Sequence, residues 1–293
     1  MTDSLSVSEL SVTAGAVAAA AAPLAVQRVR HLLKARLVDV RAVQRLGPHF
    51  VRVTFGGAEL HDLISASFDD HVKLMLPADP DAAPLLPVFD GGRPDGEPGP
   101  GARLHDSAPR PLMRDYTPRR VDTAAGELDI EFVLHGDGPA AAWAAQARVG
   151  QQVGIGGPRG SLVVPTGFAW HLLIGDETAL PAIDRRLEEL PAGVQAIVIV
   201  ELGDAADRRP LTSRAELALH WCGREPGSAA LLQALRRLEL PAGDGYAWAA
   251  GEAHAVAAVR ELLVGTHGLP KERVRAAAYW KHGDAGHHRT LGD

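Results

Sequence analysis

The sequence predicts two domains, an N-terminal antiparallel β-barrel followed by a C-terminal α/β domain with a parallel sheet. The 293 residues are enough for two domains of ordinary size. Up to about residue 164, short alternating strands are separated by glycine and proline turns. After Gly167, nearly continuous apolar runs alternate with helical stretches, which is typical of a parallel sheet covered on both faces. The boundary is predicted between Pro165 and Phe168.

The first 28 residues are predicted to be a disordered tail. The stretch from Ala14 to Val26 is apolar but mostly alanine, and no basic residue precedes it. A secretory signal begins with positive charge and has a leucine-like centre, so this start does not match one. No stretch approaches the roughly 20 apolar residues of a membrane span. We therefore expect a cytoplasmic protein without a membrane anchor.

The barrel strands are predicted from alternating patterns. Residues 36–57 are predicted to form a β-hairpin or a pair of neighbouring strands, bounded by Gly-Pro and Gly-Gly, and "DHVKLMLP" predicts a third strand at 71–76. Residues 79–110 hold so many prolines and glycines that we expect no regular element there, only a functional or disordered loop. Further strands are predicted at "RDYTPRRV" and at "GELDIEFVLH", then a helix begun by Pro139, then a strand, a turn and a strand over 151–165.

In the second domain, four apolar runs are predicted strands: "WHLLIG", "QAIVIVEL", "ALHWC" and "YAWAAG". Helices are expected near 178–190, 227–238 and 252–264. The glycines at 154–160 do not form a dinucleotide fingerprint, because the strand-like "SLVVP" follows them where a helix is required.

Composition excludes several functions. A net charge of −6 argues against nucleic-acid binding, which needs a basic surface. The single cysteine, Cys222, can form neither an intrachain disulfide nor a four-thiolate iron–sulfur cluster, and we expect it to be a core residue. The thirteen histidines lack the i, i+4 pairing that favours structural zinc, so no dedicated metal site is predicted.

Two segments of the first domain have two interpretations each. "PLMRDYTPRR" at 111–120 is either an edge strand with a half-buried Tyr116 and solvated arginines, or part of a binding site. "HGDGPAAAW" at 135–143 is either an ordinary strand–helix turn or an anion site, in which the first N–H groups of the helix bind a pyrophosphate.

In the second domain, ligands are expected at the carboxyl ends of the strands. Asp176, Glu177 and Thr178 follow the first strand and are suited to capping the next helix. Further strand ends fall at 201–203, 222–224 and 251–252. After the second strand, Glu201, Asp204, Arg208 and Arg209 could distinguish a nucleotide ribose from its 2′-phosphate. Their mixed signs leave NADH and NADPH open, and leave open that they are solvated charges.

Five of these segments occur in the order found in a known family: "RDYTPRR", "DIEFVLHGDGPAAAWAAQARVGQQVGIGGPRGS", "GDETALPAI", "AWAAGE" and "YWKHG". Over residues 30–283 the chain resembles siderophore-interacting proteins, FAD-dependent ferric-siderophore reductases related to ferredoxin–NADP reductases. The resemblance implies a Greek-key FAD-binding barrel at 29–167. It also implies an NAD(P)H-binding α/β domain with a C-terminal extension at 168–293.

The resemblance also implies roles for single residues. In the Arg-x-Tyr-Thr motif, Arg114 contacts the FAD pyrophosphate, Tyr116 packs on the flavin, and Thr117 approaches flavin N5. Tyr116 and Thr117 are thus the predicted catalytic residues. Further predicted cofactor-binding residues are His71, Lys73, His135, Gly136, Gly138, Ala140, Ala141, Ala142 and Trp143 for FAD, and Gly175, Asp176, Glu177, Thr178, Gly251 and Glu252 for the nicotinamide nucleotide.

The implied substrate is a ferric siderophore. Lys281 and His282 are expected to receive this anionic chelate at the flavin edge, with Arg119 and Arg120 either contributing or simply solvated. The implied reaction passes electrons from NAD(P)H through the flavin to Fe(III) and releases Fe(II). The alternatives are a flavin reductase with another acceptor, a ferredoxin as the electron donor, and a flavin- or siderophore-binding module without turnover.

Overall fold

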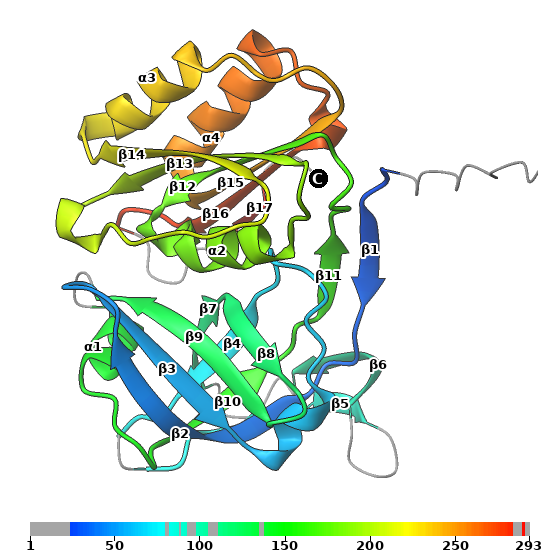
Figure 1. Ribbon diagram of the computed structural model, residues 1–293. Coiled ribbons are helices and arrows are strands. Elements are labelled where there is room, and N and C mark those ends of the chain that lie inside the picture. Colours follow the sequence, from blue (N-terminus) through cyan, green and yellow to red (C-terminus); the bar gives the residue numbers. More distant parts are fainter. Residues whose placement is uncertain are drawn as a thin grey trace, which may run out of the picture.

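A computed structural model shows two domains stacked on one another (Figure 1). It describes residues 24–79, 82–87, 89–92, 98–104, 111–134, 138–283 and 289–290. None of the helices among these residues is both long enough and apolar enough to cross a membrane.

The first domain is a seven-stranded antiparallel sheet with the order β7-β4-β10-β2-β3-β9-β8. Its strands are β2 (Ala35–Arg45), β3 (Phe50–Gly56), β4 (Val72–Leu76), β7 (Leu112–Tyr116), β8 (Pro118–Asp122), β9 (Glu127–Val133) and β10 (Gln152–Gly156). The sheet curls around buried side chains, among them Val53, Phe55 and Phe132. Among the described residues no ladder joins the edge strands β7 and β8, so the predicted barrel is a half-barrel.

Short helices close this sheet. The single-turn η1 (Ala58–Asp62) follows β3, and α1 (Pro139–Ala145) begins at the proline that predicted it. Trp143 of α1 is buried and stacks on Phe55 with ring centroids 6.1 Å apart, which holds the helix against the curled sheet.

Two predictions for irregular segments are wrong. The 79–110 segment contains a two-stranded antiparallel sheet, β5 (Phe89–Gly92) with β6 (Pro98–Leu104). Proline can begin a strand outside a central ladder, which is where Pro98 lies. The expected tail over residues 1–28 also ends too late, because β1 (Gln27–Arg30) pairs with β11 (Gly160–Val163). Residues 1–23 lie outside the described part of the chain.

The second domain is a six-stranded sheet in the order β14-β13-β12-β15-β16-β17. The strands β12 (Trp170–Asp176), β13 (Gln195–Leu202), β14 (Glu216–Gly223), β15 (Gly245–Glu252) and β16 (Val274–Trp280) are parallel, and β17 (Arg289–Thr290) is antiparallel to β16. The four predicted strands are confirmed. The fifth, β16, was missed because three alanines form the centre of "VRAAAYW" and interrupt the strand-like pattern.

Helices cover both faces of this sheet (Figure 1). On the face toward the first domain lies α2 (Leu180–Glu189), preceded by the turn η2 (Glu177–Ala179). The other face carries α3 (Ala229–Arg237) and α4 (Ala253–Glu261). The remaining single turns are η3 (Ala205–Asp207), η4 (Pro226–Ser228), η5 (Leu262–Thr266) and η6 (Lys271–Arg273).

Candidate functional site

Thr117 joins β7 to β8 at the point where the two domains meet. It is 7% exposed, and its side chain shares a hydrogen bond with Tyr279 near the end of β16. Burial raises the pKa of Tyr279 well above its usual value, so this phenol stays protonated. The ring of Tyr279 packs edge-on against Trp248, with centroids 6.3 Å apart. The predicted catalytic threonine therefore touches the second domain directly.

Arg114 and Tyr116 lie on the same face of β7, because alternate residues of a strand share a face. The Tyr116 ring packs against Phe132 with centroids 4.5 Å apart. Arg114 donates to the carbonyl of Met113 and, among the described residues, forms no ion pair. A guanidinium that is not ion-paired with any described residue thus lies on the same face as an aromatic ring. That pairing fits a phosphate joined to a flat ring system, as in FAD.

The start of α1 also fits a phosphate. Its N-cap Gly138 has no side-chain cap, and a Cβ added there would meet no atom of the described residues within 4 Å. Ala140 and Trp143 are buried against the sheet, so they can only hold the helix in place, and backbone N–H groups remain as donors. His135 and Gly136, also predicted here, lie outside the described residues.

The structure separates Lys73 from this group. Lys73 pairs across the β4–β7 ladder with Asp115, and their side chains form an ion pair of 2.6 Å. Residue 115 lies between 114 and 116, so this pair occupies the opposite face of the ladder from Arg114 and Tyr116. His71 directly precedes β4 and is half-buried.

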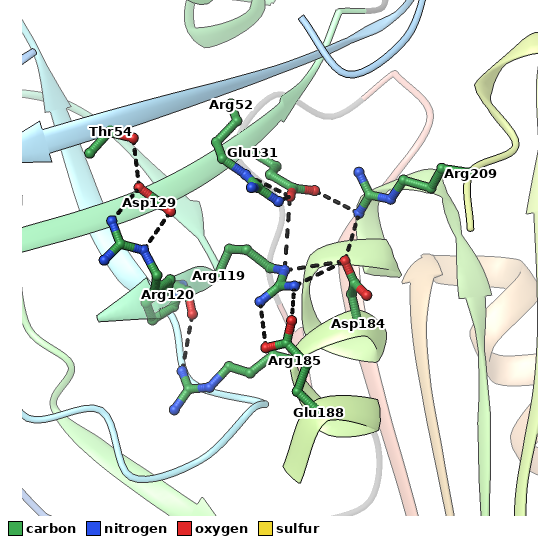
Figure 2. A network of polar contacts seen from close by, with 11 residues as sticks. Arg52, Thr54, Arg119, Arg120, Asp129, Glu131, Asp184, Arg185, Glu188 and Arg209 are labelled. Carbon is green, nitrogen blue, oxygen red and sulfur yellow. Dashed lines mark hydrogen bonds and ion pairs between the residues drawn. The ribbon is translucent and has the colours of Figure 1, made fainter. Parts of the chain in front are cut away.

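The two arginines after the motif lie in a polar network rather than on an open surface (Figure 2). Arg119 is 8% exposed and bonds to Asp184 at 3.1 Å and Glu188 at 2.5 Å, both on α2. Arg120 is half-exposed and bonds to Asp129 at 2.8 Å and Glu127 at 2.6 Å within its own domain. The expectation that Arg119 receives a substrate on the surface does not agree with this burial, because its donors are used between the domains.

A second bridge between the domains was not predicted. Asp69, buried in the first domain, accepts hydrogen bonds from Trp248 Nε1 at 2.8 Å and from Arg275 Nε at 2.9 Å. Asp69 precedes β4 in a segment without a recognisable motif, so the sequence carried no signal for this contact.

In the second domain, the strand order reverses between β12 and β15, and the carboxyl ends of the strands gather there. Asp176 joins three of these ends. Its Oδ1 accepts from the Thr178 N–H at 2.9 Å, which confirms the predicted cap, and its Oδ2 accepts from the Glu252 N–H at 3.0 Å and from Trp280 Nε1 at 2.8 Å. A Cβ on Gly251, whose φ is +144°, would lie 2.6 Å from Oδ2, so glycine is required beside this carboxylate.

Arg224 directly follows β14, and its side chain connects residues at the carboxyl ends of two other strands. It donates to Glu177 at 2.9 Å, makes a second short contact with that carboxylate, and reaches Glu201 Oε2 at 3.4 Å. Its guanidinium also lies 5.9 Å from the centre of the Trp280 ring. Burial raises the pKa of both glutamates. The part played by Trp280 and Arg224 was missed, although both stand directly at strand ends.

Glu201 is the residue before last of β13 and lines a crevice with Gly175, Ser228 and Gly251. It is 3% exposed, and its Oε2 accepts from Ser228 Oγ at 3.0 Å. Its Oε1 is buried and has no hydrogen-bond partner among the described residues. A ligand hydroxyl or amine entering the crevice could donate to it.

The other residues expected near a nucleotide are dispersed. Arg209 turns to the domain interface and bonds to Glu131 at 2.7 Å (Figure 2). Arg208 is exposed, and Asp204 caps η3 by accepting from the Ala206 N–H. Lys281 and His282, which were predicted to receive the substrate, follow β16 directly; Lys281 is half-buried and His282 is exposed.

Two family profiles match the chain. One described as a siderophore-interacting FAD-binding domain covers residues 39–162, and one described as siderophore-interacting protein covers residues 168–283. The matches together account for both structural domains.

Two reductases and one solved structure are similar to this chain over most of its length. The NADPH-dependent ferric-chelate reductase of Escherichia coli is 36% identical over 87% of this chain and 96% of its own length. The ferric vibriobactin reductase ViuB of Vibrio cholerae is 31% identical over 85% and 90%. The crystal structure of a siderophore utilization protein from T. fusca is 37% identical, covers 89% of this chain and 98% of its own, and has a TM-score of 0.78.

Proposed function

The chain belongs to the siderophore-interacting protein family, and from that membership we propose that it is an FAD-dependent reductase of ferric siderophores that uses NAD(P)H and releases Fe(II). One observation carries the proposal beyond family membership. Thr117, which ends the Arg114–Tyr116–Thr117 motif of the FAD domain, hydrogen-bonds to Tyr279 of the second domain. An electron acceptor held by the motif would therefore lie within reach of the strand ends where a nucleotide is expected.

When bound, FAD supplies a group that accepts a hydride and donates single electrons. The protein's own contribution is binding and orientation. We assign the pyrophosphate to Arg114 and the start of α1, the ring contact to Tyr116, and a hydroxyl beside the reactive nitrogen to Thr117. Arg114 can do this without breaking an ion pair with any described residue.

The nicotinamide nucleotide is assigned to the edge formed by Gly175, Glu177, Gly251 and Glu252. Asp176 and Thr178 hold this edge together, because the hydrogen bonds of Asp176 fix the ends of β12, β15 and β16. Asp176 is therefore assigned as a positioning residue rather than as a direct ligand of the nucleotide.

The substrate is assigned to the exposed side of the same interface. Lys281 and His282 follow β16 directly after Tyr279 and Trp280, where cationic side chains would attract an anionic ferric chelate. Reduced iron is bound far less tightly by hard oxygen donors, so reduction releases it without an acid or base acting on the metal. Since NAD(P)H is a cytoplasmic reductant, we expect the reaction to take place in the cytoplasm.

The test is an anaerobic titration of the purified holoprotein, followed by its visible spectrum. We expect a flavin spectrum that NADH or NADPH bleaches, and reoxidation by ferric citrate, a ferric hydroxamate or a ferric catecholate, with Fe(II) trapped by ferrozine. Bleaching without reoxidation by any of the three chelates would refute the iron assignment. A flavin that resists both nucleotides but accepts electrons from a reduced ferredoxin would assign the donor to ferredoxin.

A further inference from the structure

We propose that two copies of this chain form a symmetric dimer in which β14 of one copy pairs antiparallel with β14 of the other, so that the two six-stranded sheets become continuous. The inference goes beyond the proposed reductase, because it concerns a surface that the candidate site does not use. β14 is the outermost strand of the second-domain sheet (Figure 1), and among the described residues it pairs only with β13.

The backbone of β14 has an open row of hydrogen-bonding groups. The N–H of Glu216 donates to the Val194 carbonyl at 2.8 Å. At the other end, the N–H of Arg224 donates to the Leu202 carbonyl at 2.9 Å, so the even-numbered residues direct their backbone groups to β13. The odd-numbered residues from 217 to 223 therefore direct their N–H and C=O groups away from the sheet, where no described strand receives them. Such an edge is a template for pairing with another strand.

The other edges of the two large sheets are shorter and better protected. Natural sheets protect exposed edges with short strands, charged side chains, proline or bulges. At the opposite edge of the same sheet, β17 has two residues. The edge strands of the first-domain sheet, β7 and β8, have five residues each and carry charged side chains among them. β14 has eight residues, an unbroken register with β13, and no proline, lysine or arginine.

The side chains of β14 match those of a second copy in one register. With the two-fold axis at Ala218, Glu216 lies opposite His220 of the partner subunit, and the symmetry repeats this pair on the other side of the axis. An imidazole N–H can donate to a carboxylate, and a charged imidazole also attracts it. On the other face of the strand, Leu217 lies opposite Leu219 of the partner subunit. Complementary polar pairs and apolar pairs directly across antiparallel strands both stabilise the pairing.

Neighbouring registers fit less well. An axis placed between two residues would bring outward-facing backbone groups opposite inward-facing ones, so no ladder could form. With the axis at Leu219, Glu216 would lose its histidine partner. The exposed Arg214 would also face Arg224 of the partner subunit, and two cations directly opposite each other are destabilising. Charge therefore selects the register centred on Ala218.

The approach to this edge is open. Exposed side chains of β14 and residues that follow α3 line a hollow of about 370 Å³ beside the strand, among them Glu216, Ala218, His220, Leu238 and Pro241. The small side chain of Ala218 at the axis lets two strands come within pairing distance. Because the paired strands run antiparallel, their carboxyl ends point away from each other. Each copy therefore keeps its own strand-end site accessible.

Cysteine cross-linking tests the pairing and its register. Ala218 faces its own symmetry mate in a pair without direct hydrogen bonds, where Cα atoms lie about 4.5 Å apart, and a disulfide spans about 4.4–6.8 Å. We therefore expect Ala218→Cys, made in a Cys222→Ser background, to form a covalent dimer under mild oxidation that dithiothreitol reverses. Ala58→Cys in the same background is the control, because Ala58 is exposed in the first domain. A yield of covalent dimer no higher than that of the control would overturn the proposal.

Sedimentation of the holoprotein at increasing concentration measures the dimer without a cross-link. We expect species of one and of two chains, each chain of 30.9 kDa, in proportions that depend on concentration. Ala218→Lys places two like charges at the axis and should leave a monomer at every concentration, with an unchanged circular dichroism spectrum. A native chain that is monomeric throughout, or a dimer that persists in Ala218→Lys, would refute the pairing of β14.

A charge exchange tests the pair of Glu216 and His220. His220→Glu puts two carboxylates opposite each other in both symmetry-related pairs, so the dissociation constant of the dimer should rise at least about fivefold. Adding Glu216→His gives each pair one carboxylate and one imidazole again, with positions exchanged, and should return the constant to near its native value. Adding Glu261→His instead is the control, because Glu261 is exposed on α4, away from this edge. No recovery with Glu216→His, or equal recovery with Glu261→His, would show that the register is wrong.

Discussion

Replacing Arg119 by methionine tests whether the domain interface depends on a buried ion pair. Arg119 is 8% exposed and is bonded twice to Asp184, itself largely buried on α2. Methionine has a similar length and no charge, so among the cations that the structure describes the substitution leaves Asp184 paired with Arg209 alone, 3.6 Å away. The second partner, Glu188, is half-exposed and can be solvated when the arginine is lost.

The magnitude follows from which charge is left behind. Removing one partner of a buried ion pair costs about 3–5 kcal/mol, because the remaining charge stays buried. The exposed Glu188 adds little, since surface pairs contribute about 0–1 kcal/mol. Arg209 still partly neutralises Asp184, which places the expected loss near the lower limit. We therefore expect Arg119→Met to lower the free energy of unfolding by about 3 kcal/mol.

The assay is equilibrium urea unfolding followed by circular dichroism, with Arg120→Met as the control. Arg120 is adjacent in sequence, but it is half-exposed and its partners belong to its own domain. Its partner Asp129 is buried but keeps the hydrogen bond from Thr54 Oγ1 at 2.7 Å, so we expect Arg120→Met to cost about 1–2 kcal/mol, less than Arg119→Met. Equal losses for the two variants would refute the argument that burial between the domains decides the cost.

The same variant has a predictable pH dependence. Burial already raises the pKa of Asp184, and loss of Arg119 removes a charge that lowers it. The folded variant would then hold a proton that the unfolded chain releases above pH about 4. The free energy of unfolding falls with rising pH in that window, so the penalty should be smaller near pH 5 than near pH 7.5. A penalty independent of pH would contradict an unpaired carboxylate.

Three further changes test other parts of the molecule. Arg114→Ala should yield colourless protein, and a fully yellow variant would show that the phosphate site lies elsewhere. Cys222→Ser should leave NAD(P)H-dependent flavin reduction unchanged, because burial raises the pKa of the Cys222 thiol and so disfavours a reactive thiolate; loss of reduction would contradict this. Burial, together with the charge of Arg186, lowers the pKa of His171 to about 3. Between pH about 6.5 and 3 the unfolded chain therefore binds a proton at this histidine that the folded protein does not bind, so the free energy of unfolding should fall as the pH drops through this window. His171→Gln should flatten that fall in the unfolding midpoint, and an unchanged slope would contradict it.

The strands that the sequence predicted are those whose pattern reflects burial. β3 alternates and β13 is continuously apolar, and both are as expected. The strand β16 was missed because alanine has no strong strand preference. β5 and β6 were missed because a high content of proline and glycine does not indicate which segments pair as strands.

The sequence suggests which residues form the candidate site but not which contacts they make. The Arg114–Tyr116–Thr117 segment and the strand ends of the second domain could be named from the sequence. The bond from Arg119 to Asp184 spans 65 residues and that from Trp248 to Asp69 spans 179. No local pattern contains such a pairing, because each partner alone resembles an ordinary surface charge or core residue.

The contacts that each arginine already makes indicate which arginine can bind an external anion. Arg119 and Arg209 are committed to carboxylates across the domains, and Arg185 of α2 donates to the Ser65 and Pro118 carbonyls of the first domain. For any of these three, binding an external anion would break contacts that hold the domains together. Arg114 alone among these four has no such contact with another described element. An incoming phosphate therefore gains most at Arg114, and a ferric chelate has least to gain at Arg119.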